Sequence, residues 1–273
     1  MSYVLPSYDI ENVIEFDYKY GSDENSKTVI GYYLKARQKA EHIYTAYELI
    51  TNEGNGSSYR ILIADDISIV LYNTGYLNTT GSDKNAQSVV CTFEAYGTRI
   101  LFTGDAEKGC EANYASLVGN IDILKVAHHG TYNATETSTL NYIDPEVAIV
   151  CNGNYLGNEY GHPTYDALNR LYSYDANMLV YAITGANITD FQTVASNGPG
   201  ATAQVLYQYK TSKRSNFYFK CDSPSDALAQ RNGNIRINIT EHTYTVSSEF
   251  YNTTPLEIKD TDYYTLMVAH WND

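Results

Sequence analysis

The fold is decided by three short runs of sequence: RILFTGD (99–105), IDILKVAHHG (121–130) and EVAIVCNGNYLGNEYGHP (146–163). Each run is apolar, rich in β-branched residues, and stops at a glycine or loop signal, which predicts three strands. A residue able to bind a metal stands at or beyond each end: Asp105, the pair His128 and His129, or His162. Catalytic groups of layered α/β proteins gather outside the carboxyl ends of strands, so we expect these side chains to converge.

The flanking sequence predicts helices between these strands. Helical spacing covers residues 107–118, 136–142 and 164–174, and a further strand is predicted at 178–184. Upstream we expect a helix over 22–44, strands over 59–66 and 67–72, and a hairpin over 88–105 that turns at Tyr96 and Gly97. Strands that alternate with helices predict a layered α/β fold.

The length predicts one sizeable domain. With 273 residues the chain can bury a site in its core, and we treat 1–273 as a single domain. Residues 192–229 lose periodicity and are rich in Gly, Ser, Asn and Lys, so we interpret them as an insertion. Residues 233–248 alternate in polarity and predict a closing hairpin, whereas 249–273 carry no clear pattern.

Charge and hydropathy limit the possible partners. The formal net charge of −14 opposes loose adhesion to nucleic acid or to an anionic membrane, so a phosphate substrate needs local positive charge such as divalent cations. No window approaches the roughly 18 apolar residues of a membrane helix, and the first residues do not resemble a signal peptide. The compartment stays open between the cytoplasm and secretion as part of a longer protein. The four cysteines lack CxxC spacing and are expected to be reduced.

Each candidate side chain has a simpler structural interpretation. Asp105 can cap the helix that comes after it, and His162 can be the neighbour of a helix cap. A doubled histidine at a strand exit is harder to explain by packing, and the three strand ends together form a more specific signal than any one of them. The other histidines, His42, His242 and His270, are interpreted as structural or solvated.

The residue types favour metal-dependent hydrolysis. Imidazole and carboxylate groups suit Zn²⁺, Mn²⁺ or iron, and an aspartate can bridge two such ions. A metal pair lowers the pKa of bound water and neutralises charge that develops on a phosphoryl or carbonyl oxygen. The sequence contains no Walker loop, dinucleotide GxGxxG or GxSxG elbow that would indicate another enzyme class.

The motifs resemble a known family. NAQSVVCTFEAYGTRILFTGD (85–105), DILKVAHHGTYNATE (122–136), and DPEVAIVCNGN with EYGHPTYDALNRL (144–171) resemble the metallo-β-lactamase-fold domain of ComEC-type competence proteins. The resemblance runs from about Ile10 to Thr184, and GNIRINITEHTYTV resembles the closing hairpin. It implies an αββα sandwich, a site for one or two ions of Zn or Mn in the intact domain with the alternative of none in this chain, and phosphodiesterase or nuclease activity on a nucleic-acid-like substrate. Asp105 would be the metal-bridging carboxylate, His128 or His129 a ligand or transition-state contact, and His162 the histidine of the GHP motif. Asn85 and Ser88 match the segment where other branches place a ligand histidine.

One departure from that family has structural consequences. The main metal signature, HxHxDH, is absent, since no two histidines are separated by one residue. The first residues resemble the segment that lies directly downstream of that signature in the family, so we expect an N-terminally truncated domain: a fragment, a miscalled start or a shortened relative. Such a domain would expose a sheet edge able to pair with the missing segment or another chain, and full hydrolysis would need an upstream segment.

The sequence supports three hypotheses for function. The first is a metal-dependent hydrolase with catalytic residues Asp105, His128 and His129 and metal ligands Asp105, His128, His129 and His162. The alternative is a catalytically inactive scaffold or binding module with the same fold. A third is a surface protein whose 192–229 segment binds a partner or glycan.

Overall fold

A computed structural model describes most of the chain. It covers residues 9–16, 27–79, 83–152, 162–183, 190–193, 203–210, 213–220, 232–251 and 254–272, and between 190 and 220 it describes the backbone alone. Among these residues, every helix is too short or too polar to cross a membrane.

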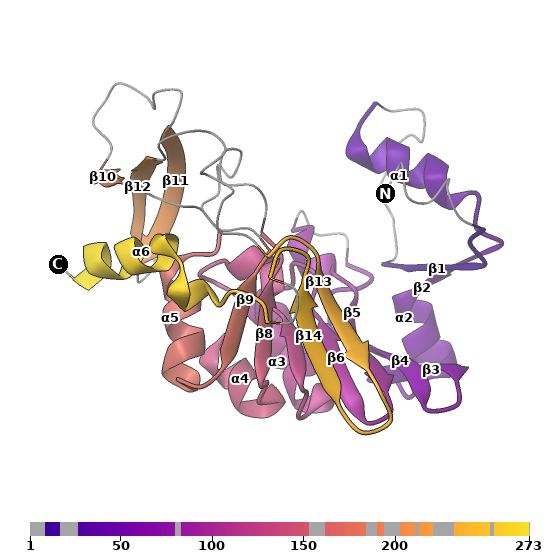
Figure 1. Cartoon of the computed structure of the whole chain (residues 1–273). Helices are drawn as coiled ribbons and strands as arrows, with labels where there is room; N and C mark the ends of the chain where they lie inside the picture. Colours follow the sequence, from indigo (N-terminus) through magenta and orange to yellow (C-terminus); the bar gives the residue numbers. More distant parts are fainter. Residues whose placement is uncertain are drawn as a thin grey trace.

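A seven-stranded sheet forms the centre of the molecule (Figure 1). Its strands, in spatial order, are β3 (Ser58–Ala64), β4 (Ile67–Tyr72), β5 (Val90–Ala95), β6 (Thr98–Phe102), β7 (Ile123–Lys125), β8 (Val147–Val150) and β9 (Leu179–Ala182). Neighbours from β3 to β6 are antiparallel, and neighbours from β6 to β9 are parallel. The parallel strands are joined through α3 (Lys108–Val118), α4 (Thr137–Ile143) and α5 (Tyr165–Tyr174). The carboxyl ends of β6, β7 and β8 therefore lie at one edge.

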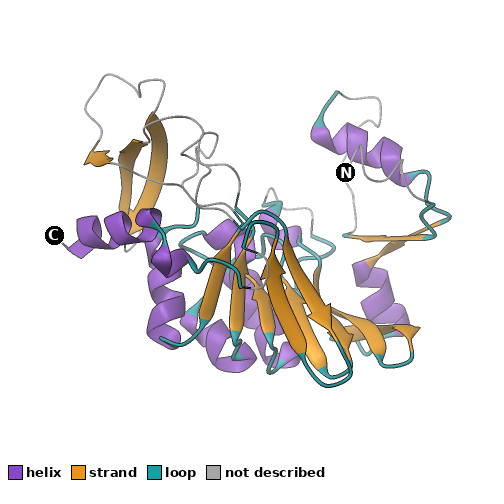
Figure 2. Cartoon of the chain, viewed as in Figure 1, coloured by secondary structure: helices purple, strands orange, loops and turns teal. Residues whose placement is uncertain are grey.

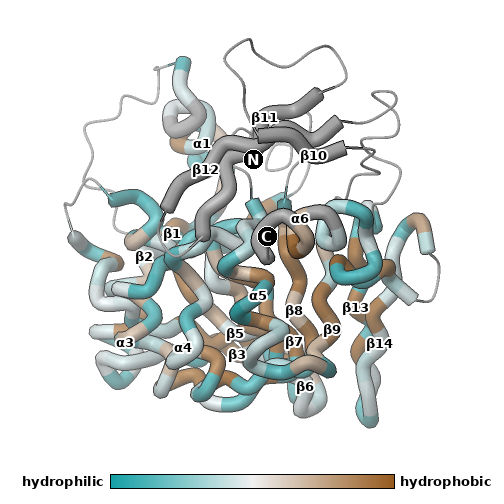
Figure 3. The backbone as a smooth tube through the Cα atoms, turned by 90° about the vertical axis from the view of Figure 1, so that its left-hand side faces the viewer, coloured by the Kyte–Doolittle hydropathy of each residue, from teal (hydrophilic) through white to brown (hydrophobic). Residues whose placement is uncertain are grey.

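The sheet is covered on both faces (Figure 2). Helices α3, α4 and α5, with α6 (Asp262–Asn272), pack on the face that carries Leu101 and Leu124. The hairpin of β13 (Ile235–Ile239) and β14 (Tyr244–Ser248) packs on the opposite face, against Ile100 and Ile123. Successive residues of a strand point to opposite faces, so each strand contributes to both cores. Figure 3 shows that β8 and β9 are among the most hydrophobic strands, as expected for strands buried on both faces.

The predicted α/β class is confirmed, and so are the helices that connect the parallel strands. The helix predicted over 22–44 is wrong in its second half, and residues 22–26 lie outside the described residues. Helix α1 (Val29–Arg37) begins at the cap Thr28, and the chain then enters strand β2 (His42–Thr45). The physical reason is tertiary pairing, because β2 lies parallel to β1 (Asn12–Glu15) and the His42 amide donates to the Glu11 carbonyl at 2.9 Å. His42 therefore lies on a strand and not late in a helix. A short helix α2 (Ala46–Glu48) and a π-helical turn η2 (Leu49–Glu53) come next.

Two C-terminal regions contain structure that the sequence pattern did not predict. Within and beside the 192–229 segment, the backbone forms β10 (Asp190–Thr193), β11 (Ala203–Lys210) and β12 (Lys213–Lys220), which make a separate sheet. Whether this segment is an insertion stays a prediction. The tail forms the turn η7 (Ile258–Asp260) and α6. Tyr263 and Met267 of α6 are fully buried, so tertiary packing defines a helix whose sequence has little amphipathic pattern.

Strand β3 forms one outer edge of the main sheet. Its Leu62 and Ile63 are 71% and 57% exposed, which agrees with the apolar surface expected at such an edge. The cysteines that the structure describes, Cys91, Cys110 and Cys151, are free, and Cys221 lies outside the described residues.

Candidate functional site

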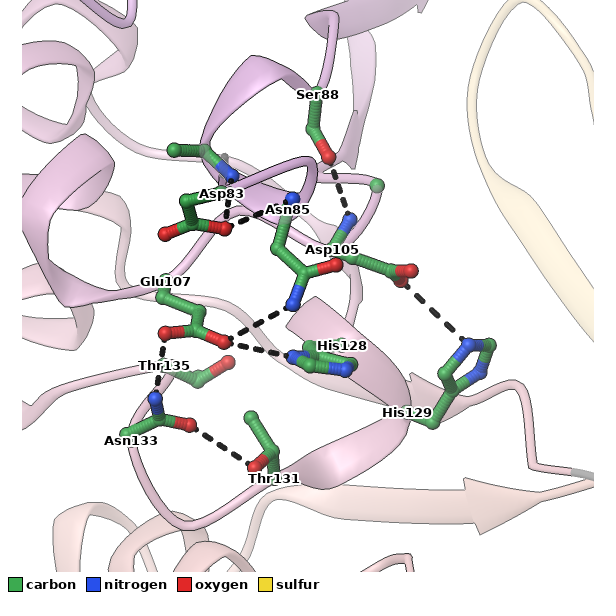
Figure 4. A network of polar contacts seen from close by, with 12 residues as sticks. Asp83, Asn85, Ser88, Asp105, Glu107, His128, His129, Thr131, Asn133 and Thr135 are labelled. Atoms are coloured by element: carbon green, nitrogen blue, oxygen red, sulfur yellow. Dashed lines mark hydrogen bonds and ion pairs between the residues drawn. The ribbon is translucent and has the colours of Figure 1, made fainter. Parts of the chain in front are cut away.

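Three of the predicted site residues lie where β6 and β7 end, and the fourth, His162, lies beyond β8 and packs against His128. Asp105 comes after β6, His128 and His129 after β7, and Cys151 after β8. Figure 4 shows Asp105 and His129 directed toward each other, with His128 beside them on a network of polar contacts. Asp105 and His129 lie close together because parallel strands in register place their carboxyl ends side by side, whereas a site shared by all four predicted residues stays a prediction.

A close backbone approach holds Asp105 in position. Gly104 has a φ of +56°, and a Cβ atom there would lie 2.8 Å from the side chain of Ser88. Because glycine leaves that space free, the Asp105 amide donates a hydrogen bond to Ser88 Oγ at 2.9 Å. Ser88, which the resemblance associates with a ligand position, therefore orients the backbone of the carboxylate.

The two histidines occupy a strained turn. His128 and His129 have φ values of +45° and +57°, in the left-handed region, and Gly130 comes next at +83°. For a residue other than glycine this conformation costs on the order of 1 kcal/mol. A Cβ at Gly130 would lie 2.7 Å from Cβ of Pro163, so the turn packs tightly on the segment that carries His162. Strain of this kind persists where the surroundings determine the conformation, and here it presents two adjacent imidazoles at one strand end.

His129 is held by a backbone carbonyl. Its Nδ1 donates to the carbonyl oxygen of Cys151, because a carbonyl can only accept. The other ring nitrogen, Nε2, lies 3.5 Å from Oδ1 of Asp105. In the neutral tautomer Nε2 is an acceptor that faces a carboxylate, which is a repulsive arrangement. A proton on Nε2 or a cation between the two atoms is needed to make it favourable.

His128 is held by Glu107 (Figure 4). Its Nδ1 lies 3.1 Å from Oε1 of Glu107, and the same carboxylate accepts from the side-chain amides of Asn85 at 3.2 Å and Asn133 at 2.5 Å. Asn133 also accepts from the Thr131 hydroxyl at 2.9 Å. Glu107 therefore fixes the ring of His128 and leaves Nε2 as the nitrogen that can act as a ligand or contact a substrate.

His162 faces His128. Their ring centroids are 5.4 Å apart in an edge-on arrangement. Burial lowers the pKa of His162 to about 4, and the nearby His128 and His129 lower it as well, whereas Asp105 acts in the opposite direction. His162 is therefore neutral at pH 7. Helix α5 takes Thr164 as its cap, since Thr164 accepts from the Ala167 amide, so His162 has no capping role.

A lysine lies among these groups. Lys125 ends β7, its side chain is 15% exposed, and its ammonium donates to the Gly104 carbonyl at 2.5 Å. The same nitrogen lies 3.9 Å from Oδ1 of Asp105. Burial lowers the pKa of Lys125, while Asp105 and Cys151 oppose that shift. One carboxylate oxygen thus faces an ammonium on one side and an imidazole on the other.

The structure decides between the interpretations of Asp105. Helix α3 has Glu107 as its cap residue, so Asp105 stands two residues before the cap and is directed toward His129 instead. Sequence reasoning missed Glu107 and Lys125. Each carried a signal: Lys125 is a charge inside an apolar strand run, and Glu107 is a second carboxylate close behind Asp105.

The chemical types of the donor atoms suit a divalent ion, but the described residues supply fewer donors than a complete ligand set. Carboxylate oxygen and neutral imidazole suit Zn²⁺ or Mn²⁺, and both histidines have Nδ1 engaged with an acceptor, as metal-binding imidazoles do. Asp105 and His129 face each other, and His128 faces His162. Across the part of the chain that the structure describes, no three carboxylate, thiol or imidazole groups gather closely enough to hold a metal ion. An ion at this site would draw its further ligands from water or substrate oxygens.

Comparison with known proteins shows similarity to three bacterial proteins. The chain is 34% identical to Recombination protein 2 of Haemophilus influenzae over 101 residues, which is 37% of this chain and 13% of that protein. It is 33% identical to Competence protein ComA of Neisseria gonorrhoeae over 131 residues, 47% of this chain and 18% of the relative. It is 33% identical to ComE operon protein 3 of Bacillus subtilis over 100 residues, 36% of this chain and 13% of the relative. No family model matches the chain.

These matches cover part of each molecule. The chain spans less than a fifth of the length of the relatives, so the similarity concerns one segment of much longer proteins. The resemblance to competence proteins predicted from the sequence motifs is supported over that segment.

Proposed function

We propose that this chain is a metal-assisted phosphodiester hydrolase domain related to those of competence proteins. The single observation that carries the proposal is the position of Asp105 against His129. A carboxylate oxygen and an imidazole nitrogen face each other at 3.5 Å, while the other ring nitrogen is engaged with the Cys151 carbonyl. This arrangement calls for a positive charge between the two groups, and a divalent cation meets the requirement.

The residues have separable roles in this proposal. Asp105 and His129 would hold a divalent ion, which would lower the pKa of a bound water and neutralise charge on a phosphoryl oxygen. His128, which Glu107 orients, would contact the reacting phosphate or donate a proton to the leaving oxygen. His162, neutral because of burial, would be an uncharged ligand or would help to orient His128. Ser88 and Gly104 would keep the Asp105 backbone in place.

Similarity to the relatives supports a nucleic-acid-like substrate, and the negative charge of the protein permits one if positive charge is concentrated at the site. Two of the relatives are named as a recombination protein and a competence protein. The net charge of −14 would repel a polyphosphate chain on average, so binding would require positive charge concentrated at the site. A divalent ion together with Lys125 would provide it.

The test is metal-dependent cleavage of a phosphodiester. The purified chain would be incubated with bis(p-nitrophenyl) phosphate and with single-stranded DNA, in Mn²⁺, in Zn²⁺ and in EDTA. We expect residual cleavage, slower than that of a domain completed by an upstream segment, that requires the ion and falls by at least about a hundredfold in Asp105→Asn, since loss of one key electrostatic group costs this much in many active sites. Equal turnover in EDTA, or in Asp105→Asn, would contradict the proposal.

A matched control is provided by Asp144. This residue ends α4 in the left-handed conformation, with a φ of +41°, and its carboxylate accepts from Tyr174 at 2.8 Å. Asparagine adopts this conformation well and can accept the same hydrogen bond. Asp144→Asn should therefore fold and cleave like the wild type, which would separate loss of the site carboxylate from general loss of negative charge.

The second candidate function is an inactive scaffold or binding module. The observation that favours it is that no three-donor group is found among the described residues. In that case the Asp105 and His129 side chains would contact each other without a metal ion. Metal analysis distinguishes the two functions. A scaffold would bind no stoichiometric Mn²⁺ or Zn²⁺, whereas a hydrolase domain would bind the ion in both the wild type and Asp144→Asn.

A further inference from the structure

The position of Lys125 bears on how tightly the site can hold an ion. Lys125 is the last residue of β7, and β7 lies between β6 and β8, so Lys125 belongs to a central strand of the sheet. Its exposed fraction is only 15%. A buried ammonium is costly unless polar partners compensate it. The partners present are the Gly104 carbonyl at 2.5 Å and Asp105 Oδ1 at 3.9 Å, and both belong to the loop that carries the candidate metal-binding carboxylate.

The ammonium and the proposed ion share one oxygen atom. Oδ1 of Asp105 is the atom that lies 3.5 Å from His129 Nε2 and also the atom that lies 3.9 Å from Lys125 Nζ. The backbone around the lysine is fixed as well, because the Lys125 carbonyl accepts from the Thr103 hydroxyl at 2.8 Å. The lysine therefore has little freedom to withdraw when a cation approaches Asp105.

We propose that Lys125 is a built-in counter-ion of Asp105 that weakens divalent-ion binding and keeps the ion exchangeable. The inference rests on the proposed function and adds to it the strength of metal binding. Two cations beside one carboxylate repel each other, and the repulsion is stronger in a partly buried site than in water. A fixed ammonium also prevents Oδ1 from bridging a second ion. The site would hold one loosely bound ion, and an anionic phosphodiester would add the negative charge that stabilises it.

The experiment measures Mn²⁺ binding to the whole chain without substrate. Free Mn²⁺ would be followed by electron paramagnetic resonance for the wild type, Lys125→Met and Asp105→Asn. We expect Lys125→Met to bind one Mn²⁺ about ten-fold more tightly than the wild type, because a unit charge a few ångströms away has been removed. Lys125→Met should also retain its ion through gel filtration, whereas the wild type should lose it. Asp105→Asn should bind none.

The control and the folding check use other positions and another substitution. Lys259 forms an ion pair with Glu257 at 2.7 Å and lies in η7, so Lys259→Met removes an equivalent ion-paired charge elsewhere. It should bind Mn²⁺ like the wild type. Lys125→Gln also removes the charge but keeps a hydrogen-bond donor for the Gly104 carbonyl. If thermal unfolding shows that Lys125→Met is destabilised, Lys125→Gln takes its place and should show the same tighter binding of Mn²⁺.

The outcomes separate the inference from the function on which it depends. If the wild type and Lys125→Met bind Mn²⁺ equally, or if Lys125→Met binds it more weakly, Lys125 is not an opposing charge and the inference is overturned while the metal site stands. If the wild type holds two ions, the inference is overturned as well. If neither protein binds Mn²⁺, the proposed function fails, and the inference fails with it.

Discussion

The two ends of the same sheet differ in how they are covered. At β7 and β8, Ile123, Leu124 and Ala148 have at most 1% of their surface exposed, between helices on one face and a hairpin on the other. At the outer strand β3, Leu62 and Ile63 are 71% and 57% exposed. Both regions are apolar strands by sequence. The difference shows that burial by helices and the hairpin, and not apolar sequence, distinguishes the strands beside the candidate site. The buried strands hold their side chains in fixed positions, whereas the edge strand leaves apolar surface exposed.

The largest effect expected from this comparison concerns the two leucines. Leu124→Ala should lower the free energy of unfolding by about 3 kcal/mol, since it creates a cavity between α3, α4 and the sheet. Leu62→Ala should change it by less than about 0.5 kcal/mol, since the side chain is already solvated. Urea denaturation followed by circular dichroism measures both. Similar losses in the two variants would mean that the edge is covered in solution.

The next effect compares two glycines with similar backbone angles. Gly130 has a φ of +83° and Gly56 a φ of +81°, but a Cβ at Gly130 would meet Pro163 whereas a Cβ at Gly56 would meet nothing within 4 Å. Gly130→Ala should cost about 2 kcal/mol and Gly56→Ala about 1 kcal/mol, because only the first adds a clash to the strain. Thermal unfolding of both variants gives the difference. Equal costs would show that the histidine turn can move away from Pro163.

A smaller effect concerns metal binding through Glu107. If the proposed ion site exists, Glu107→Gln should weaken Mn²⁺ binding by about ten-fold, because it removes a carboxylate charge that contacts His128 beside the ion and so lowers the negative potential around the ion. Glu53→Gln, at an exposed position near the outer strand, is the matched control and should bind like the wild type. Calorimetric titration with Mn²⁺ provides the measurement. Unchanged Mn²⁺ binding in Glu107→Gln would show that this carboxylate only stabilises the loop.

The last effect is a pH dependence from His162, which acts on the unfolding equilibrium and not on metal binding. Its pKa is about 4 in the folded protein and near 6.5 in an unfolded chain, so below pH 6.5 the unfolded state takes up a proton that the folded state does not. The stability from this group is present above pH 6.5 and is lost as pH falls through 6.5 toward 4, by about 2 kcal/mol at pH 5. Urea denaturation of the metal-free protein at pH 7 and pH 5 measures the loss, and His162→Gln should reduce it. A wild-type protein that gains stability toward pH 5 would contradict the assignment.

Much of the central sheet was predictable from local pattern, for reasons that individual elements show. The runs that end at Asp105 and His128 are short, apolar and bounded by glycines, so their strand character is independent of context. Helices α3, α4 and α5 lie between strands at the expected spacing. The prediction failed at His42, where a helical pattern gave way to pairing with β1, and at α6, where burial of Tyr263 and Met267 defines a helix of weak pattern.

The residues of the candidate site could be predicted from the sequence, but their contacts with one another could not. Asp105, His128 and His129 are recognisable because each comes soon after a strand end, and His162 because it stands in the GHP motif that comes before a predicted helix. Their partners were not. The Cys151 carbonyl, the Glu107 carboxylate and the Lys125 ammonium act through contacts between segments that are separated by 20 to 26 residues, as in the Lys125 contact with Asp105 or the Asn133 contact with Glu107. The metal roles of the four predicted residues stay a prediction.

The sequence by itself determined the strands, the order of the motifs and the identity of the convergent side chains, because hydrophobic period and glycine position act locally along the chain. Only the tertiary structure decided that Asp105 faces His129 rather than a helix end, and that an ammonium stands beside the same oxygen. Those relations depend on how neighbouring strands are registered and covered, and register is a property of the assembled sheet.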